Sequence, residues 1–581
     1  MPPPPQDSPA RRLLPWLALT ALYTTLTLVY FWPLPRLAGD HIGPGFGDPL
    51  FNLYVLKWGA HQIGLRLPDV WDANFYYPTR GTLTYSDHLL GPAAELFLFL
   101  NIVPNAIAGY NFLLLSAFVA SALTVCWVLR RSGLSWIAAG LAGWMYAFSS
   151  FRLLHIWHLQ LLIAQWIPLT LWFWDRLLAE RTAKAAVLFL LFYLLNLSGG
   201  CYFAYMIHFP LLAILYSRAR AEGRELVSRR SLRVLVPVAI VAAACVALVF
   251  LPYARISRAQ GLSRSFSEMR VFGAGLASYL SPSDQTLYFG ADQQRFLRRF
   301  LGESVDLFRR PENELFAGFL PTILFFVGAA AAVRGRHEGP ADPWVRGLVL
   351  SGLLCFALSF AKVYVPLARI LPGLSGMRVP ARFYAFTSLT LVYFAGRGAD
   401  LLLRRVPGPR TRAALAVGLA AVLAVELAPR TLDWERLPRE EEMPRAYFWL
   451  RDQPAVKALV ELPIYNDVRE NEYLYAATVH WKPIANGTSG YRAQSYLDLF
   501  DSIQKRLPRA GGFVLLRSLG ITHVVLHTDT TIRQQAIHRW EDQLGTGPER
   551  RMEKVYEEEG IAVYRLIDPP PADPAPPDPD R

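Results

Sequence analysis

Aspartates that could take part in chemistry are concentrated in one polar segment near the start of the chain, from Gly39 to His88. The segment contains Asp40, Asp48, Asp69, Asp72 and Asp87. A rigidly held carboxylate can act as a general base, orient an acceptor hydroxyl or bind a metal. Pro49 can open a helix, so we expect Asp48 at that helix's N-cap. Asp48 is the first catalytic candidate and Asp87 the second; the alternative for Asp48 is capping alone.

Polar side chains also interrupt the apolar middle of the chain, at Arg152, His155, His158, Gln160 and Gln165. Polar groups inside long apolar stretches are costly, and they are usually either functional or paired. The spacing of His155 and His158 predicts that both lie on one helical face, where they could bind a phosphate or a metal. The alternative is a pair of histidines hydrogen-bonded to their neighbours.

Two arginines, Arg378 and Arg382, lie four residues apart on either side of Pro380. Guanidinium groups bind phosphate bidentately, so these two are candidates for a phosphate site. The alternative is snorkelling or pairing with an acidic residue. A later segment, 480–491, combines turn formers with aromatic side chains that could stack on sugar rings, although a plain turn explains it equally well.

Composition identifies the class of protein. The 581 residues are 53% hydrophobic and 13% aromatic, and the mean hydropathy is +0.23. These values are typical of integral membrane proteins with many spans. The net charge of +13 comes largely from basic residues in short loops, which sets topology and does not indicate nucleic acid. All four cysteines fall in apolar runs, which argues against a disulfide framework or a zinc site.

About eleven apolar runs are long enough to be membrane spans, each needing about 20 residues. They are 13–34, 106–129, 135–151, 157–177, 184–199, 202–217, 233–253, 314–333, 345–361, 381–397 and 412–429, with the division around 184–217 left open. Residues 89–103 are too short to span, so we expect an interfacial or re-entrant helix there, with an amphipathic partner at about 49–64.

Basic loops predict the orientation. Arg130 with Arg131, Arg181 with Lys184, and the clusters 218–233, 334–336 and 397–412 occur in every second loop, as the positive-inside rule requires of cytoplasmic segments. The N-terminal tail, 1–12, is then cytoplasmic. Loops 35–105 and 254–313 and the C-terminal segment from 430 face the opposite side of the membrane.

We therefore predict a polytopic α-helical membrane domain, 13–429, followed by a soluble extracytoplasmic α/β domain, 430–568, and a disordered tail, 569–581. In the C-terminal domain, 456–462 and 521–527 are rich in strand-forming residues. Helical patterns cover 443–452, 468–478 and 494–507.

This combination resembles the GT-C-type membrane glycosyltransferases, which include the protein mannosyltransferases and the aminoarabinose transferase of lipid A. A closer likeness is to uncharacterised bacterial members that carry three short motifs, here Gly47-Asp48-Pro49, Tyr77-Pro78 with Ser86-Asp87-His88, and His155 to Gln160. The resemblance implies transfer of a sugar from a polyprenyl-phosphate carrier at the outer face of a bacterial cytoplasmic membrane. It gives Asp48 the role of catalytic base.

On that resemblance, the donor phosphate is expected at Arg378 and Arg382 with Arg152, His155 and His158, and the acceptor or sugar at His88, Gln160 and Tyr77. The acceptor would be a lipid, a glycan or a protein. The residues permit a divalent cation without requiring one. Two other function classes remain open, a transporter or flippase of lipid-linked glycans and a non-enzymatic cell-envelope assembly protein. The spans contain few acidic residues and no repeat, which disfavours transport.

Overall fold

The computed structural model describes residues 9–287, 299, 312–334, 342–464, 467–506, 510–527, 551–558 and 560–567. The chain forms two compact units. Unit 1 consists of Met1–Pro44 and Asp87–Glu435, and unit 2 consists of Gly45–Ser86 and Arg436–Arg581. The predicted tail at 569–581, residues 1–8 of the N-terminal tail, and 288–298 and 300–311 of the predicted loop 254–313 lie outside the described residues.

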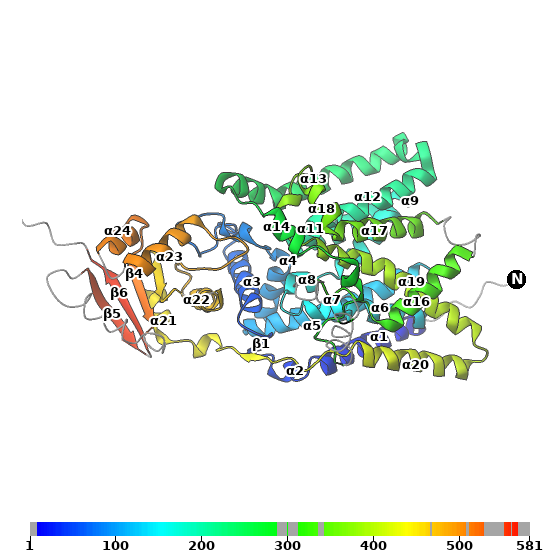
Figure 1. Cartoon of the computed structure of the whole chain (residues 1–581), viewed down its shortest axis with the longest axis horizontal. Helices are drawn as coiled ribbons and strands as arrows, with labels where there is room; N and C mark the ends of the chain where they lie inside the picture. Colours follow the sequence, from blue (N-terminus) through cyan, green and yellow to red (C-terminus); the bar gives the residue numbers. More distant parts are fainter. Residues whose placement is uncertain are drawn as a thin grey trace, which may run out of the picture. The chain divides into compact units, whose positions relative to one another are not determined.

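Unit 1 is almost entirely helical (Figure 1). Its first half contains α1 (Pro9–Tyr30), α2 (Leu34–Leu37), the short β1 (His41–Ile42), α4 (Leu90–Leu100), α5 (Ala106–Arg131), α6 (Trp136–Ala147), α7 (Ser150–Leu154), α8 (Leu159–Leu162), α9 (Trp166–Glu180), α10 (Ala183–Gly199), α11 (Cys201–Met206) and α12 (His208–Glu222). Its second half contains α13 (Arg229–Gln260), α14 (Phe266–Val271), α16 (Phe319–Arg334), α17 (Pro343–Ser359), α18 (Ala361–Ala368), α19 (Tyr384–Arg405) and α20 (Pro409–Glu426). Short 3-10 helices include η3 (Leu276–Leu280) and η6 (Pro380–Phe383), and β2 (Glu435–Arg436) lies where the units meet in sequence.

Three described helices are long and apolar enough to cross a membrane: α1 from Leu13, α5 and α13. Helices α4, α10, α16 and α17 are apolar but shorter. The predicted count of eleven spans is therefore not confirmed. Helix α4, which covers most of the predicted non-spanning segment 89–103, has 11 residues and a length of roughly 16 Å, too short to cross the hydrocarbon core.

Several of the predicted spans are interrupted in the structure. The run 135–151 is divided between α6 and α7, the run 157–177 between α8 and α9, and the run 202–217 between α11 and α12. A further break separates α7 from α8 at His155 to His158, so these two histidines do not share one helical face as predicted. His155 ends α7 and His158 precedes α8. Their ring centroids are nevertheless 5.4 Å apart.

Helices α16 and α19 pack unusually closely because glycine lies on both sides of the contact. An ideal Cβ at Gly328 would lie 2.0 Å from the carbonyl oxygen of Phe394, and one at Gly398 would lie 2.1 Å from that of Leu324. Small residues that allow two backbones to approach are typical of helix pairs in membranes.

Unit 2 combines a four-stranded sheet with helices (Figure 1). The strand order is β3-β4-β6-β5; β3 runs parallel to β4, and the other neighbours are antiparallel. The strands are β3 (Leu459–Leu462), β4 (His523–His527), β5 (Met552–Glu558) and β6 (Ile561–Leu566), and the helices are α3 (Asp48–Gly64), α21 (Arg445–Asp452), α22 (Asp467–His480), α23 (Gln494–Arg506) and α24 (Ala510–Ser518). The predicted strands and helices of the C-terminal segment are confirmed in type and place.

Residues 45–86, predicted as part of the first loop of the membrane domain, cluster with the C-terminal segment in unit 2. Helix α3 is buried along most of its length, although we expected an amphipathic helix, and it packs against α22. Next to it, Tyr76 N donates to Asn486 O at 3.0 Å, and Ile484 N donates to Asn74 O at 2.8 Å. These backbone hydrogen bonds join the two parts of unit 2.

We expect Gly398→Val to destabilise unit 1, because the new side chain would meet a backbone carbonyl that cannot rotate away. Overpacking of this kind costs about 1–3 kcal/mol, so the thermal unfolding midpoint of the detergent-solubilised chain should fall by several degrees. Gly418→Val in α20 is the matched control, because no atom lies within 4 Å of its ideal Cβ. Equal midpoints for the two variants would contradict the close crossing.

Candidate active site

The candidate site in unit 1 is built around a buried ion pair between Arg382 and Glu312. Arg382 Nε donates to Glu312 Oε2, and Nη2 donates to Oε1, both at 2.6 Å. The two residues are only 4% and 7% exposed. A bidentate pair of this kind fixes the plane of the guanidinium group. Removing one partner would leave an uncompensated buried charge.

His155 contacts the same carboxylate. Its Nε2 lies 3.3 Å from Glu312 Oε2, and its Nδ1 lies 2.6 Å from the carbonyl oxygen of Phe151. Because a carbonyl only accepts, Nδ1 carries a proton. Burial lowers the pKa of His155. Burial alone would raise the pKa of the Glu312 carboxyl, but the Arg382 charge and the contacts with His155 hold that pKa well below its ordinary value.

Tyr202 connects this ion pair to two other candidate residues. Its ring centroid lies 4.2 Å from the Arg382 guanidinium carbon, and its hydroxyl oxygen accepts from Arg378 N at 3.3 Å. Its backbone N donates to Asp87 Oδ1 at 3.4 Å, and Cys201 N donates to the same oxygen at 2.5 Å. The structure thus brings Asp87, His155, Arg378 and Arg382 into one cluster.

Asp87 can approach this backbone because Gly200 has no side chain. An ideal Cβ at Gly200 would lie 2.9 Å from Asp87 Oδ1. The Asp87 carboxylate is only 5% exposed, and its Oδ1 already accepts two backbone N–H groups. In the structure, Asp87 therefore holds the first two residues of α11, Cys201 and Tyr202, by their backbone N–H groups.

The other predicted residues of unit 1 are placed differently. Arg152 donates through Nε to Ala147 O at 2.9 Å and through Nη2 to Ala117 O at 3.2 Å, so its guanidinium supports helix packing. His88 is fully buried and accepts from Leu90 N at 3.2 Å. Burial lowers the pKa of His88 to about 4, so it is neutral at physiological pH.

His158 and Gln160 lie at the start of α8 and are partly exposed. Among the residues that the structure describes, Gln160 Oε1 and Gln165 Oε1 are buried and have no hydrogen-bond partner. Buried amide oxygens of this kind are groups that a ligand or water could satisfy.

A basic pocket of about 770 Å³ lies against the same region. Its wall includes Gly273–Gly275, and its cations are Arg270, Lys362 and Arg369, with no carboxylate among the described lining residues. A hydrogen bond connects this wall to the ion pair. Ala381, which precedes Arg382, donates its backbone N–H to the carbonyl oxygen of Phe272, which precedes Gly273, at 3.3 Å. Arg378 lies over the Phe272 ring, 5.4 Å from its centroid. Positive charge therefore continues from Arg378 into the pocket.

Asp48 and Tyr77 belong to unit 2. Gly47 is the N-cap of α3, and Asp48 is the first helical residue, one position later than predicted. Asp48 is exposed. The carbonyl of Gly47 accepts from Asn471 Nδ2 at 3.0 Å, which ties this end of α3 to α22. Tyr77 donates its backbone N–H to Ile484 O at 2.9 Å.

Unit 2 also contains buried carboxylates that the sequence analysis did not single out. Glu461 Oε2 lies 2.6 Å from His527 Nε2 and accepts from Tyr447 Oη at 3.0 Å. Glu470 Oε2 accepts from Gly487 N at 2.7 Å. Burial raises the pKa of the Glu470 carboxyl to about 8.

Two residues of the unit 1 cluster were missed by sequence reasoning, Glu312 and Tyr202. Glu312 lies in the long loop 254–313, for which the sequence predicts only the side of the membrane that it faces. Tyr202 follows Gly199-Gly200, where the division of the spans was left open. In both cases the sign in the sequence was an interruption of the apolar helical pattern, by a long loop before Glu312 and by Gly199-Gly200 before Tyr202.

Among the described residues, no group of three or more histidine, cysteine, aspartate or glutamate side chains could hold a metal ion. The four cysteines are free thiols.

The chain as a whole is similar in fold to solved structures of known enzymes. Arabinofuranosyltransferase AftD from Mycobacteria matches 95% of this chain, with a TM-score of 0.57 and 15% sequence identity. The chain therefore shares the fold of that enzyme, which confirms the GT-C resemblance expected from the sequence. Among the described helices, α1, α5 and α13 are long and apolar enough to cross a membrane. The chain spans 40% of the length of AftD.

Two further structures match over most of both chains. The oligosaccharyltransferase of Archaeoglobus fulgidus has 13% identity and a TM-score of 0.46, covering 92% of this chain and 72% of its own. ArnT from Cupriavidus metallidurans has 10% identity and a TM-score of 0.43, covering 96% and 98%. No protein-family model and no curated protein matches the chain.

We expect the stability of unit 2 to fall as the pH rises, because the folded state favours the protonated form of Glu470. The pKa of this carboxyl is about 8 in the folded chain and 4.5 as a reference value. Its contribution is complete below pH 4.5 and is lost as the pH rises to about 8, by an amount on the order of several kcal/mol. Thermal unfolding of the full chain between pH 5 and 9 measures this effect.

Glu470→Gln should flatten that pH dependence, since the amide has no charge to bury. Glu472→Gln, on the same helix but partly exposed, is the control and should keep the slope of the wild type. An unchanged slope in Glu470→Gln would show that another group causes the effect.

Proposed function

We propose that the chain is a membrane glycosyltransferase that moves a sugar from a polyprenyl-phosphate donor to a lipid, glycan or protein acceptor. The reaction would take place at the outer face of a bacterial cytoplasmic membrane. The observation that supports this most is the cluster of Arg378 and Arg382 around Tyr202, beside a pocket lined by three cations. The GT-C fold agrees with it, although fold alone does not decide function.

In this proposal Arg378 contacts the donor phosphate directly. Its side chain is partly exposed and lies over Phe272, at the wall of the basic pocket. Arg382 has a supporting role, because Glu312 already accepts from its Nε and Nη2. The rigid Arg382–Glu312 pair holds Tyr202, and Tyr202 in turn holds the backbone of Arg378. Preorganised positive charge stabilises the developing charge of a leaving phosphate.

The chemical step is a direct displacement. The acceptor oxygen forms a bond to the anomeric carbon as the bond from that carbon to the phosphate oxygen breaks. The electron pair leaves with the polyprenyl phosphate, and the acceptor proton moves to a carboxylate base. Asp48 is the proposed base, since its carboxylate is exposed at the start of α3. Displacement of this kind inverts the configuration of the sugar.

We expect Arg378→Gln to lower turnover by about 100-fold or more, the usual effect of losing a group that stabilises transition-state charge. Purified full-length protein would be incubated with a panel of synthetic polyprenyl-phosphate pentoses and hexoses and a crude membrane extract, which supplies lipid, glycan and protein acceptors. Release of polyprenyl phosphate, measured by mass spectrometry, does not require the acceptor to be known. Arg378→Lys should recover part of the activity, because it restores the charge without the bidentate geometry.

Arg405→Gln is the matched control, since this arginine is exposed at the end of α19. Release of polyprenyl phosphate by Arg378→Gln at the wild-type rate would refute the phosphate role. Failure of every donor in the panel, with intact protein, would favour a transporter or an assembly protein instead.

Asp48→Asn should reduce transfer by about 100-fold to 10,000-fold, the range for loss of a general base. Asp87→Asn is the informative comparison, because asparagine keeps the oxygen that accepts from Cys201 N and Tyr202 N. We expect Asp87→Asn to keep most of the activity. The opposite pattern would make Asp87 the base. No step of the proposal uses a metal, so added chelator should leave the rate unchanged.

A further inference from the structure

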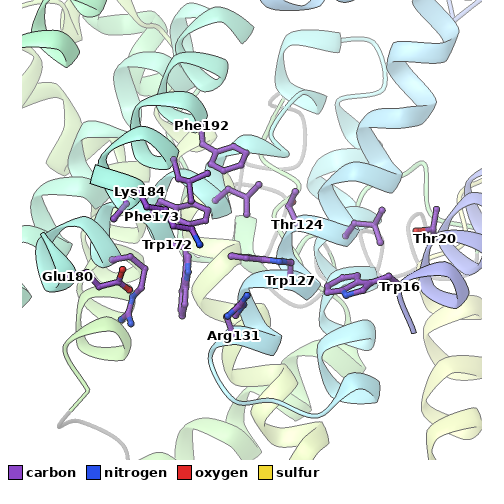
Figure 2. A pocket seen from close by; sticks show the side chains of 15 residues that line it. Trp16, Thr20, Thr124, Trp127, Arg131, Trp172, Phe173, Glu180, Lys184 and Phe192 are labelled. Atoms are coloured by element: carbon purple, nitrogen blue, oxygen red, sulfur yellow. The ribbon is translucent and has the colours of Figure 1, made fainter. Parts of the chain in front are cut away.

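A second, larger pocket opens in unit 1 between α1, α5, α9 and α10, and Figure 2 shows the side chains that line it. Its volume is about 810 Å³, within the usual range of about 300–1,000 Å³ for pockets that hold small molecules. Tryptophan and phenylalanine dominate the wall, with Trp16, Trp127, Trp172, Phe173 and Phe192.

The pocket is amphipathic, with charge at one end. Each helix contributes charged and apolar residues to the wall: Trp127 and Arg131 come from α5, Trp172 and Arg176 from α9, and Lys184 and Leu188 from α10. Helices α5 and α9 end at their charged residues, and α10 begins beside its lysine. The apolar residues lie one or more turns further along each helix.

Two of the pocket's three cations, Arg131 and Arg176, lie over aromatic rings. The guanidinium carbon of Arg131 lies 5.2 Å from the Trp127 ring centroid, and that of Arg176 lies 4.9 Å from the Trp172 ring centroid. Figure 2 shows Arg131 next to Trp127. Such cation–π contacts preorganise the charge without neutralising it.

Positive charge exceeds negative charge at this end of the pocket. Arg176 Nη2 donates to Asp175 Oδ2 at 2.6 Å, but the same carboxylate also accepts from Arg218 Nε and Nη2, each at 2.6 Å. One carboxylate is therefore shared by two guanidinium groups. Glu180 is the one acidic residue among the described lining residues, against Arg131, Arg176 and Lys184.

We propose that this pocket binds an anionic phospholipid of the bilayer. Its phosphodiester would lie among Arg131, Arg176 and Lys184, and an acyl chain would lie along the aromatic and leucine wall. Cations attract anionic headgroups, and tryptophan favours the boundary between headgroup and hydrocarbon. A free inorganic anion would leave the apolar wall uncovered, whereas a zwitterionic lipid would bring its own cation to a cationic site.

The site is separate from the candidate active site. Helix α9 begins at Trp166, a few residues after His158, and ends at Glu180. Its 15 residues span roughly 22 Å, so the charged end of the pocket lies at the opposite end of this helix. The proposal therefore does not depend on the glycosyltransferase function.

Lipid titrations of the purified full-length protein in detergent test the proposal, with thermal unfolding and native mass spectrometry as readouts. Dioleoyl phosphatidylglycerol should bind and raise the unfolding midpoint, whereas dioleoyl phosphatidylcholine and inorganic phosphate should not. Each cation near an anionic lipid contributes roughly a factor of five. The double variant Arg131→Gln/Lys184→Gln should therefore bind phosphatidylglycerol about 20-fold more weakly.

The double variant Arg405→Gln/Arg410→Gln is the charge-matched control, since both of its residues are exposed on other helices, and it should bind like the wild type. Leu188→Trp should also weaken binding, because it fills the apolar wall while all the cations remain. Arg131→Gln/Lys184→Gln should unfold at the wild-type temperature without lipid, because Arg131 and Lys184 are exposed. For Leu188→Trp, the unfolding midpoint without lipid is measured first, and the shift on adding lipid is compared with the wild-type shift.

Any of three results would overturn the proposal. They are equal binding of phosphatidylglycerol and phosphatidylcholine, unchanged phosphatidylglycerol binding by Arg131→Gln/Lys184→Gln, and inorganic phosphate reproducing the full stabilisation. A synthetic polyprenyl phosphate that competes at equal concentration would likewise overturn it, by assigning the pocket to the donor lipid.

Discussion

A charge buried among apolar helices has to be paired or hydrogen-bonded within the protein, and this constraint shapes unit 1. Arg382 is matched by Glu312, and Arg218 by Asp175. Glu426, at the end of α20, accepts the backbone N–H groups of Phe319 and Leu320 at the start of α16. Each pairing joins segments that are distant in sequence. Breaking one would leave an unpaired buried ion, which costs several kcal/mol. The same pairings that hold the helices together therefore also fix the side chains of the candidate site.

The site is made mostly from the places where helices stop. His155 lies between α7 and α8, Tyr202 follows the break after Gly199, and Arg382 is in the short η6. Irregular backbone at membrane depth is tolerated only where it is buried in protein or lines a cavity. Here a released backbone group finds its partner in a distant part of the sequence, as when Cys201 N donates to Asp87 Oδ1. Polar residues that would weaken a continuous span are thereby concentrated at one place.

The sequence predicted the helical class, most helix positions and the strands β3 and β4, because apolar periodicity and strand-forming residues are local properties. It also placed Arg382, His155 and Asp87 among the candidates. It could not find their common partners, since Glu312 is 70 residues from Arg382 in a loop without a regular pattern. The break at His155 was missed for a related reason: a window long enough to recognise a span averages over a short polar turn. The site assignments for Asp48 and Tyr77 remain predictions.

Unit 2 is formed by two segments that are far apart in the sequence, and this affects how the C-terminal part of the chain can be produced. Its sheet is encoded after residue 436, but α3 and residues 74–77, whose backbone is hydrogen-bonded to Ile484 and Asn486, come from near the start of the chain. A fragment that begins at 436 would expose the face of α22 that α3 covers, and would leave the carbonyls of Ile484 and Asn486 without their donors. During synthesis, this unit cannot be completed until the chain as far as β6 has left the ribosome. A recombinant version would need both pieces, either joined by a linker or expressed together.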